Sequence, residues 1–230
     1  MRGLWESTGN VSYLEDGHQL VRNTIAASGW LLESASAVNS TAWQGLGRAG
    51  ILEEICDSPG KCDQNGHTFK GIYFHHLSIF CKALPVEPLV PGLTHVANKT
   101  LALLHRKGCR EYALWVAHNA RAAVKTRDQE GRFGTWWGAD SITPELEPVA
   151  LPRGAVDYRN DASELLREPW MHSHYRSETR SPRSSSTVST PQHPTPTSSD
   201  PNTRGRGRTV ESHSGGVAIL RALWEFLNQT

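Results

Sequence analysis

The chain has 230 residues, enough for one large domain or two small ones, and 37% of them are hydrophobic. Its 24 basic and 23 acidic side chains leave a net charge of +1, which offers no electrostatic case for nucleic acid or a membrane surface. No apolar run approaches the ~20 residues that span a bilayer. The opening residues, MRGLWESTGN, lack the apolar core of a secretory signal. We therefore expect no nucleic-acid partner, no membrane-spanning segment and no signal peptide in this chain.

The first part of the chain reads as two helices and a loop. Residues 2–7 resemble the end of a helix, and a turn follows at residues 8–10. Ser12 and Glu15 form a capping-box pattern, which predicts a helix from there to about residue 30. One face of that helix is marked by Leu14, His18, Val21 and Ile25. Residues 31–49 are small and polar and predict a loop or a frayed helix.

A third helix is predicted from Thr68, which stands where an N-cap belongs. Its apolar stripe of 3.6-residue period consists of Phe69, Ile72, Tyr73, His76, Leu77, Phe80 and Leu84. His76 is therefore expected to be a core histidine. Lys70 would lie in the first turn, where a cation opposes the helix dipole. This position makes Lys70 a candidate site residue.

Prolines at 85, 88 and 91 end that helix, and two further helices follow. The first is expected over 93–106, closed by Gly108, with Val96, Leu101 and Leu104 as its apolar positions. The second is expected over 110–127, and its inner face comprises Tyr112, Trp115, Asn119, Ala122 and Ala123. Asn119 on that face would either cap a neighbouring backbone or contact a ligand. A glycine-punctuated loop follows at 130–140.

The last third changes in composition. Residues 141–171 show little periodicity and predict an irregular connector. Residues 172–208 are rich in Ser, Thr, Pro and Arg, so they predict a disordered tract. A final helix is expected within 209–230, and its inward residues would be Val217, Leu220, Trp224 and Leu227. The predicted fold class is all-α.

Four cysteines and four glycosylation sequons indicate whether the protein enters the secretory route. Cys56 and Cys62 enclose a short loop that a local disulfide could close, whereas Cys81 and Cys109 either pair or remain buried thiols. Their spacing fits no zinc pattern, and we expect no metal and no cofactor. The sequons begin at Asn10, Asn39, Asn98 and Asn228. They make these asparagines glycosylation candidates and favour a secretory route.

Three stretches together resemble one known family. The first is Gly50–Glu54 with Cys56 and Cys62, leading into Phe69–Tyr73 and Leu77; the second is STGNVSYL at 7–14. The third comprises Asn119-Ala120, Arg127-Asp128, Gly131, Phe133-Gly134, Trp137 and Gly138. They are similar to the fungal branch of glycoside hydrolase family 76, which contains endo-1,6-α-mannanases and related cell-wall transglycosidases. His75 stands where that family has an arginine.

The resemblance implies an (α/α)6 barrel of which this chain supplies the C-terminal part, residues 1–140 and the final helix at 209–230. It implies hydrolysis of α-1,6-mannosidic bonds in cell-wall mannan by two carboxylates. Two alternatives remain: a transglycosidase that links GPI-anchored proteins to glucan, and a non-catalytic carbohydrate-binding remnant. The partner would be mannan or another cell-wall polysaccharide, and the location would be secreted or associated with the cell wall or membrane.

The adjacent aspartate pair that catalyses the reaction in that family has no counterpart in these 230 residues. The nearest combinations are Glu53-Glu54, Glu15-Asp16 and Asn160-Asp161, and each is expected to be a surface or turn feature. We therefore assign no catalytic residue and expect the chain to be inactive by itself.

Substrate-binding candidates are Phe69, Lys70, Tyr73, Trp136 and Trp137. The two tryptophans would either stack on a pyranose ring or plug the end of the barrel. Lys70 would either donate to sugar hydroxyls or be an ordinary surface lysine. Part of a ring would expose apolar helix faces, so we expect the isolated chain to be poorly soluble or to self-associate.

Overall fold

The structure, a computed structural model, describes residues 1–140 and 200–228, and within them it is mostly helical. The helices are α1 (Arg2–Thr8), α2 (Ser12–Ala27), α3 (Gln64–Cys81), α4 (Lys99–Glu111), α5 (Ala113–Lys125), the 3-10 turn η2 (Pro201–Thr203) and α7 (Val210–Asn228). The expectation of a helical fold is confirmed at this level. The predictions for residues 141–199, an irregular connector and a disordered tract, lie outside the described residues.

Two short antiparallel strand pairs lie within and at the two ends of residues 31–49, the stretch predicted to be loop or frayed helix. Strand β1 (Trp30–Leu31) pairs with β2 (Ser36–Ala37), with Trp30 opposite Ala37. Strand β3 (Gly47–Arg48) pairs with β4 (Ile51–Leu52), with Gly47 opposite Leu52. These strands are too short to show an alternating pattern, which explains why the sequence did not reveal them.

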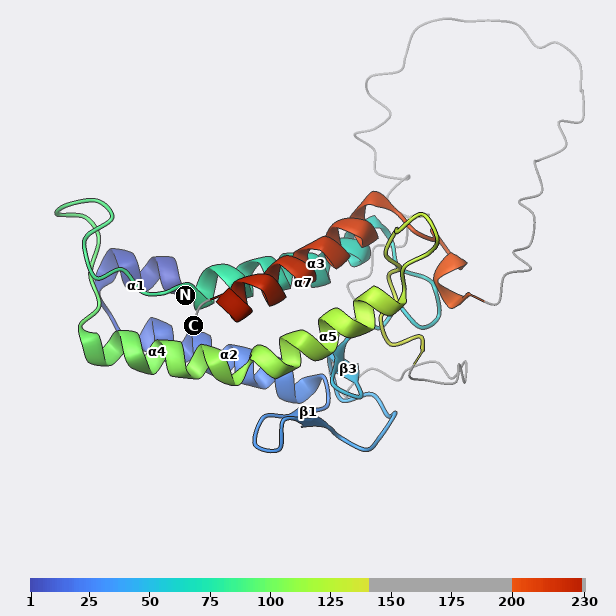
Figure 1. The fold of residues 1–230 in the computed structure, drawn as a ribbon, viewed down its shortest axis with the longest axis horizontal. Helices are drawn as coiled ribbons and strands as arrows, with labels where there is room; N and C mark the ends of the chain where they lie inside the picture. Colours follow the sequence, from blue (N-terminus) through green and yellow to red (C-terminus); the bar gives the residue numbers. More distant parts are fainter. Residues whose placement is uncertain (141–199, 229–230) are drawn as a thin grey trace, which may run out of the picture.

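The helices form two layers (Figure 1). Helices α3 and α7 lie side by side in one layer, while α2, α4 and α5 lie in the other. The two helices approach closely where Gly71 faces Gly215. A Cβ atom added at Gly71 would lie only 2.9 Å from the Cα of Gly215, so this contact requires glycine at position 71. Large side chains fill the interior, including Trp5, Ile25, Phe74, Trp115 and Ile219, all of which are buried.

Helix α3 begins five residues earlier than predicted. Its N-cap is Asp63, whose Oδ1 accepts a hydrogen bond of 2.7 Å from the backbone N–H of Gly66. Thr68 is inside the helix, where its hydroxyl donates to the carbonyl of Asn65. Lys70 therefore lies in the second turn, and the argument from the helix dipole does not apply to it.

The predicted apolar stripe of α3 is only partly the buried one. Leu77, Phe80 and Leu84 are buried, but Phe69 and Ile72 are about half exposed, and His76 is exposed rather than a core histidine. The inner face instead carries Lys70, Gly71, Phe74, Ser78 and Cys81. The helix is apolar on both sides, so periodicity could not choose the face. The buried face is the one on which Gly71 contacts Gly215 of α7.

Helix α7 is also rotated relative to the prediction. The expected inward residues Val217, Trp224 and Leu227 are 50%, 65% and 62% exposed, and Leu220 is only partly buried. The buried side carries Ser212, Gly215, Gly216, Ile219, Ala222 and Phe226. Small residues at 215, 216 and 222 let the neighbouring helices approach, so this side is inward although it is the less apolar one.

Two predicted helix boundaries are wrong. Helix α2 has Val11 as its N-cap and no side-chain capping bond, so the Ser12–Glu15 capping box does not form. Gly108 lies inside α4 rather than closing it. A Cβ at Gly108 would lie 2.8 Å from the ring of His18, so this glycine allows the approach of α2. Among the predicted apolar positions of that segment, Val96 and Leu104 are exposed and Leu101 is partly buried.

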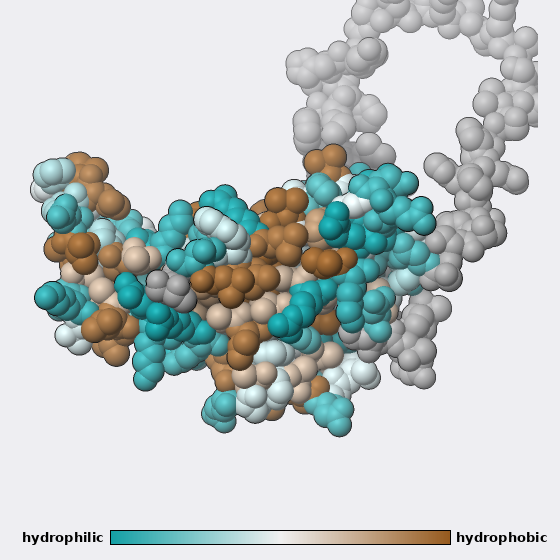
Figure 2. Space-filling view, in the orientation of Figure 1, coloured by the Kyte–Doolittle hydropathy of each residue, from teal (hydrophilic) through white to brown (hydrophobic). Residues whose placement is uncertain are grey.

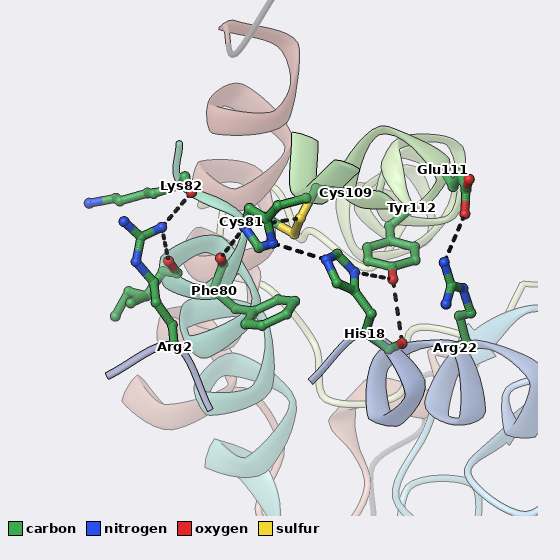
Figure 3. The surroundings of a disulfide bond; sticks show 11 residues. Arg2, His18, Arg22, Phe80, Cys81, Lys82, Cys109, Glu111 and Tyr112 are labelled. Atoms are coloured by element: carbon green, nitrogen blue, oxygen red, sulfur yellow. Dashed lines mark hydrogen bonds and ion pairs between the residues drawn. A yellow bond between two sulfur atoms is a disulfide. The ribbon is translucent and has the colours of Figure 1, made fainter. Parts of the chain in front are cut away.

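Both disulfides form in the described structure. Cys56 pairs with Cys62, as expected, and Cys81 pairs with Cys109, which decides between the two alternatives for these residues. The second bond links the end of α3 to α4 (Figure 3). Beside it, His18 lies 2.8 Å from the Tyr112 hydroxyl and 2.9 Å from Nδ1 of His105. Burial, together with His105 and Arg22, lowers the pKa of His18 to about 4, so this network contains a neutral imidazole at neutral pH.

We predict that the two disulfides contribute unequally to stability. The Cys81–Cys109 bond spans 28 residues and the Cys56–Cys62 bond spans 6. Loop-closure entropy then gives about 3.5 kcal/mol for the longer loop and about 2 kcal/mol for the shorter one. Denaturant unfolding of the two double Cys→Ala variants should show the larger loss for Cys81 and Cys109. Equal losses would contradict this account.

We also predict that the exposed face of α7 drives self-association. Figure 2 shows apolar side chains gathered along the middle of one face of the molecule, over the position of α7 in Figure 1. Replacing Trp224 and Leu227 with Gln removes two of the most exposed apolar side chains of this helix. Sedimentation should show a smaller mean mass for this variant at equal concentration. Leu104→Gln, equally exposed on α4, is the control, and an equal effect there would count against α7 as the cause.

Candidate functional site

The candidate site lies where two loops from distant parts of the sequence meet. Residues 50–63 form the cysteine-bracketed loop before α3, and residues 127–139 form the glycine-punctuated loop after α5. Both lie at the end of the helix layers where α3 and α7 begin and α5 ends (Figure 1). We call the ionic groups between these loops the loop cluster: the buried Glu53, Asp57 and Lys70 and the partly buried Arg48, with the indoles of Trp136 and Trp137.

Glu53 ties the two loops together. Its Oε1 accepts a hydrogen bond of 3.0 Å from Nε1 of Trp136, and its Oε2 lies 3.0 Å from Nε of Arg48. The residue is only 2% exposed. Burial raises the pKa of Glu53 to about 7 although Arg48 works against the shift. Glu53 is thus not the surface residue that the sequence suggested.

Asp57 and Lys70 form a second buried pair. Nζ of Lys70 lies 2.5 Å from Oδ2 of Asp57, which also accepts a 3.0 Å hydrogen bond from the backbone N–H of Glu54. Burial raises the pKa of Asp57, and the ammonium group of Lys70 opposes that shift. The same ammonium lies 5.6 Å from the ring centroid of Trp137. Removal of either charge would leave the other buried and unpaired, which costs several kcal/mol.

A third segment closes the cluster from the C-terminal side. The side chain of Asn202 accepts a 2.8 Å hydrogen bond from the backbone N–H of Trp136 and donates one of 3.3 Å to the Trp136 carbonyl. The guanidinium of Arg204 lies 5.4 Å from the Trp136 ring. Arg208 donates to the carbonyl of Thr126 at 2.7 Å. Residues 200–208 therefore make ordered contacts, and the prediction that the disordered tract extends to 208 is wrong for them.

Asn119 of α5 supports the cysteine loop through backbone contacts. Its Oδ1 accepts a 2.8 Å bond from the N–H of Leu52, and its Nδ2 donates to the carbonyls of Gly50 and Trp115, each at 3.0 Å. This amide is completely buried. Of the two roles expected for Asn119, the structure shows the backbone one.

The structure brings together three of the five predicted binding residues. Lys70, Trp136 and Trp137 meet in the loop cluster, but each is only 2% exposed, so their present positions offer no open indole face for a sugar. Phe69 projects outward from α3 at 51% exposure. Tyr73 lines a separate, largely apolar cavity of about 340 Å³ between α1, α2 and α3. The five residues therefore do not share one surface.

Sequence reasoning missed the acidic partners in the cluster. Glu53 and Asp57 flank Cys56, but a pair of carboxylates beside a loop also describes an ordinary polar turn. Lys70 lies on an otherwise apolar helical face, and a buried ammonium group requires a carboxylate partner. Its position was therefore the one feature of the sequence that indicated an acidic residue in this site. The sequence does not identify that partner as Asp57.

Three groups at the edge of the cluster have more access to solvent: Trp43, Glu54 and the hydroxyl-bearing Ser58, each partly buried. Arg48 joins this edge to the interior because its guanidinium carbon lies 5.5 Å from the ring centroid of Trp43, and its Nε bonds Glu53. Burial raises the pKa of Glu54, opposed by Lys70. An aromatic face beside charged and hydroxyl groups is an arrangement that suits a polyhydroxylated ligand.

The described part of the chain offers little room for a ligand at the loop cluster and no complete set of metal ligands. A cavity of about 10 Å³ between Asp57, His67, Thr135 and Asn202 is about the size of one water molecule. Two groups of potential metal ligands occur, His18 with His105 and Cys109, and Asp57 with Cys56 and Cys62. Each includes a cysteine whose sulfur is in a disulfide, so neither offers a thiolate.

Within residues 1–140 and 200–228, none of the helices combines the length and apolar composition that crossing a bilayer requires. Comparison of the chain with family models, with curated proteins and with solved structures finds no match.

We predict that Glu53 gives the fold a specific pH dependence. Its folded pKa of about 7 lies above its ordinary value of 4.5. The folded state therefore retains a proton that the unfolded chain loses, and the stability contributed by Glu53 falls as pH rises from 4.5 through 7. Glu53→Gln cannot ionise, so between pH 5 and 8 it should gain about 2 kcal/mol relative to the native chain.

The measurement is denaturant unfolding at several pH values in that range. Glu33→Gln, an exposed glutamate in the β1–β2 region, controls for the loss of one carboxyl group. A difference between Glu53→Gln and the native chain that is constant with pH would show that Glu53 titrates normally.

Proposed function

We propose that this chain engages α-1,6-linked mannan or a closely related cell-wall polysaccharide, as the resemblance to glycoside hydrolase family 76 implies. We further propose that its helices belong to an (α/α)6 barrel of that kind and that the protein works outside the cell or at the cell wall. Two disulfide bonds support the oxidising compartment that such a location requires.

One observation carries the proposal. Two of the stretches that resemble the family, residues 50–77 and 119–138, are separated in the sequence but meet in the loop cluster. The Glu53–Trp136 hydrogen bond of 3.0 Å and the position of Lys70 over Trp137 join them. Segments that belong to one functional site are expected to converge in this way, whereas chance similarities need not.

Within this proposal the described residues bind sugar rather than cleave it. Retaining glycoside hydrolysis requires two carboxyl groups about 5–5.5 Å apart that reach the glycosidic bond. Glu53 and Asp57 have side chains that are fully buried, and each is paired with a cation. A mannosidase or a transglycosidase would therefore need carboxylates beyond these two, and the described groups do not favour one of these reactions over the other.

The edge of the loop cluster would contact the polysaccharide. Trp43 offers a partly exposed indole on which the C–H face of a pyranose can stack. Glu54 can accept hydrogen bonds from sugar hydroxyls, and the buried Lys70–Asp57 pair holds the loop that carries it. The proposed contact is thus a shallow surface supported by a rigid ionic interior.

We expect the purified chain to bind α-1,6-mannan, and Trp43→Ala to weaken binding by about tenfold, since one stacking contact contributes on the order of 1 kcal/mol. Affinity electrophoresis or calorimetry with α-1,6-manno-oligosaccharides would measure this, with α-1,4-glucan as the comparison ligand. Trp224→Ala, an exposed tryptophan on α7, is the matched control and should bind normally.

A reducing-end assay on the same samples separates binding from cleavage. Absence of binding by the folded native chain would refute the proposed function. Release of new reducing ends would instead show that this chain cleaves the polymer, and the assignment of a binding role alone would be wrong.

A further inference from the structure

The described surface carries two glycosylation sequons whose asparagines are held in a particular orientation. Asn10 and Asn98 are both exposed, and each is followed two positions later by a hydroxyl residue, Ser12 and Thr100. Such triplets are common by chance, so the sequence by itself makes them candidates only. The geometry of the two side chains adds information that the triplet does not contain.

The side-chain carbonyl oxygen of each asparagine accepts a hydrogen bond from a backbone N–H two or three residues later in the chain. Oδ1 of Asn98 caps α4 by accepting a 2.8 Å bond from the N–H of Leu101. Oδ1 of Asn10 accepts a 3.0 Å bond from the N–H of Ser12 at the start of α2. Within residues 1–140 and 200–228 neither Nδ2 has a hydrogen-bond partner, and Nδ2 is the atom that carries an N-linked glycan. A glycan could therefore be present without loss of the Asn98 cap or of the Asn10–Ser12 hydrogen bond.

The two asparagines also belong to one end of the molecule. The α1–α2 turn and the beginning of α4 lie at the same end of the helix layers, opposite the end where α3 and α7 begin (Figure 1). A 2.7 Å hydrogen bond from the N–H of His95 to the carbonyl of Glu6 joins the segments that lead to them. Glycans at this end would leave the loop cluster uncovered.

We propose that Asn10 and Asn98 are N-glycosylated and that their glycans cover the end of the fold remote from the loop cluster. The donor is a lipid-linked oligosaccharide diphosphate. Nδ2 forms a bond to C1 of the first sugar, the lipid diphosphate leaves with the bonding electrons, and one amide proton passes to solvent. The proposal depends on the oxidising, secretory compartment that the disulfides indicate and is independent of sugar binding at the other end.

The test uses the full chain, expressed behind a cleavable leader in a eukaryotic secretory host. Glycosidase digestion should lower its mass, and peptides containing Asn10 and Asn98 should carry the mark of a removed glycan. The same digest should contain the disulfide-linked Cys81–Cys109 peptide, which identifies molecules that folded in the oxidising compartment. Unmodified Asn10 or Asn98 in those molecules overturns the assignment of that residue.

Paired variants separate the glycan from the cap. Asn98→Asp keeps an N-cap acceptor but has no amide nitrogen, whereas Thr100→Ala keeps the Asn98 cap but destroys the sequon. Each should lose one glycan relative to the native chain, as should Asn10→Asp and Ser12→Ala. Asn65→Asp, an exposed asparagine outside any sequon, should lose none. Retention of the full glycan mass by both variants of a pair would refute the site.

Discussion

The buried ionic contacts between Lys70 and Asp57 and between Arg48 and Glu53 are the constraint on which this end of the structure depends. Lys70 and Asp57 are removed from water and each depends on its partner, while Glu53 is buried 3.0 Å from the partly buried Arg48; together these contacts fix the cysteine loop, the start of α3 and the tryptophan loop relative to one another. Trp136, Asn202 and Arg204 extend the same constraint to the residues before α7. A hydrophobic cluster would tolerate small shifts that these geometries do not.

The second constraint is the close approach of α3 and α7 at Gly71 and Gly215. Two helices that meet through glycine must turn their smaller residues toward each other, and this explains the exposure of larger apolar side chains on the outside. Phe69, Ile72, Trp224 and Leu227 are outward for this reason. The apolar surface that results is consistent with helices that belong to a larger assembly, as the proposed barrel would require.

The two ends of the molecule differ in chemistry. One end contains the loop cluster, whose partly exposed edge of Trp43 and Glu54 is the proposed sugar contact. The opposite end contains the start of α4, which Asn98 caps, and the turn before α2, where Asn10 accepts a hydrogen bond from Ser12; both asparagines are exposed. Between them, the Cys81–Cys109 disulfide and the His18 network join the two layers. This division places the proposed ligand contact and the proposed modifications on surfaces that do not compete.

From the sequence, the helical class, the approximate positions of six helices and the local Cys56–Cys62 bond could be predicted, because these depend on residues close together in the chain. The sequence also singled out Lys70 and the tryptophan loop. The buried faces of α3 and α7 could not be predicted in this way, since both sides of these helices carry apolar residues and the buried side depends on the glycine contact between them. Only the tertiary structure shows that Lys70 pairs with Asp57 and that Glu53 is buried against Trp136, because these partners come from loops whose relative positions no local pattern specifies.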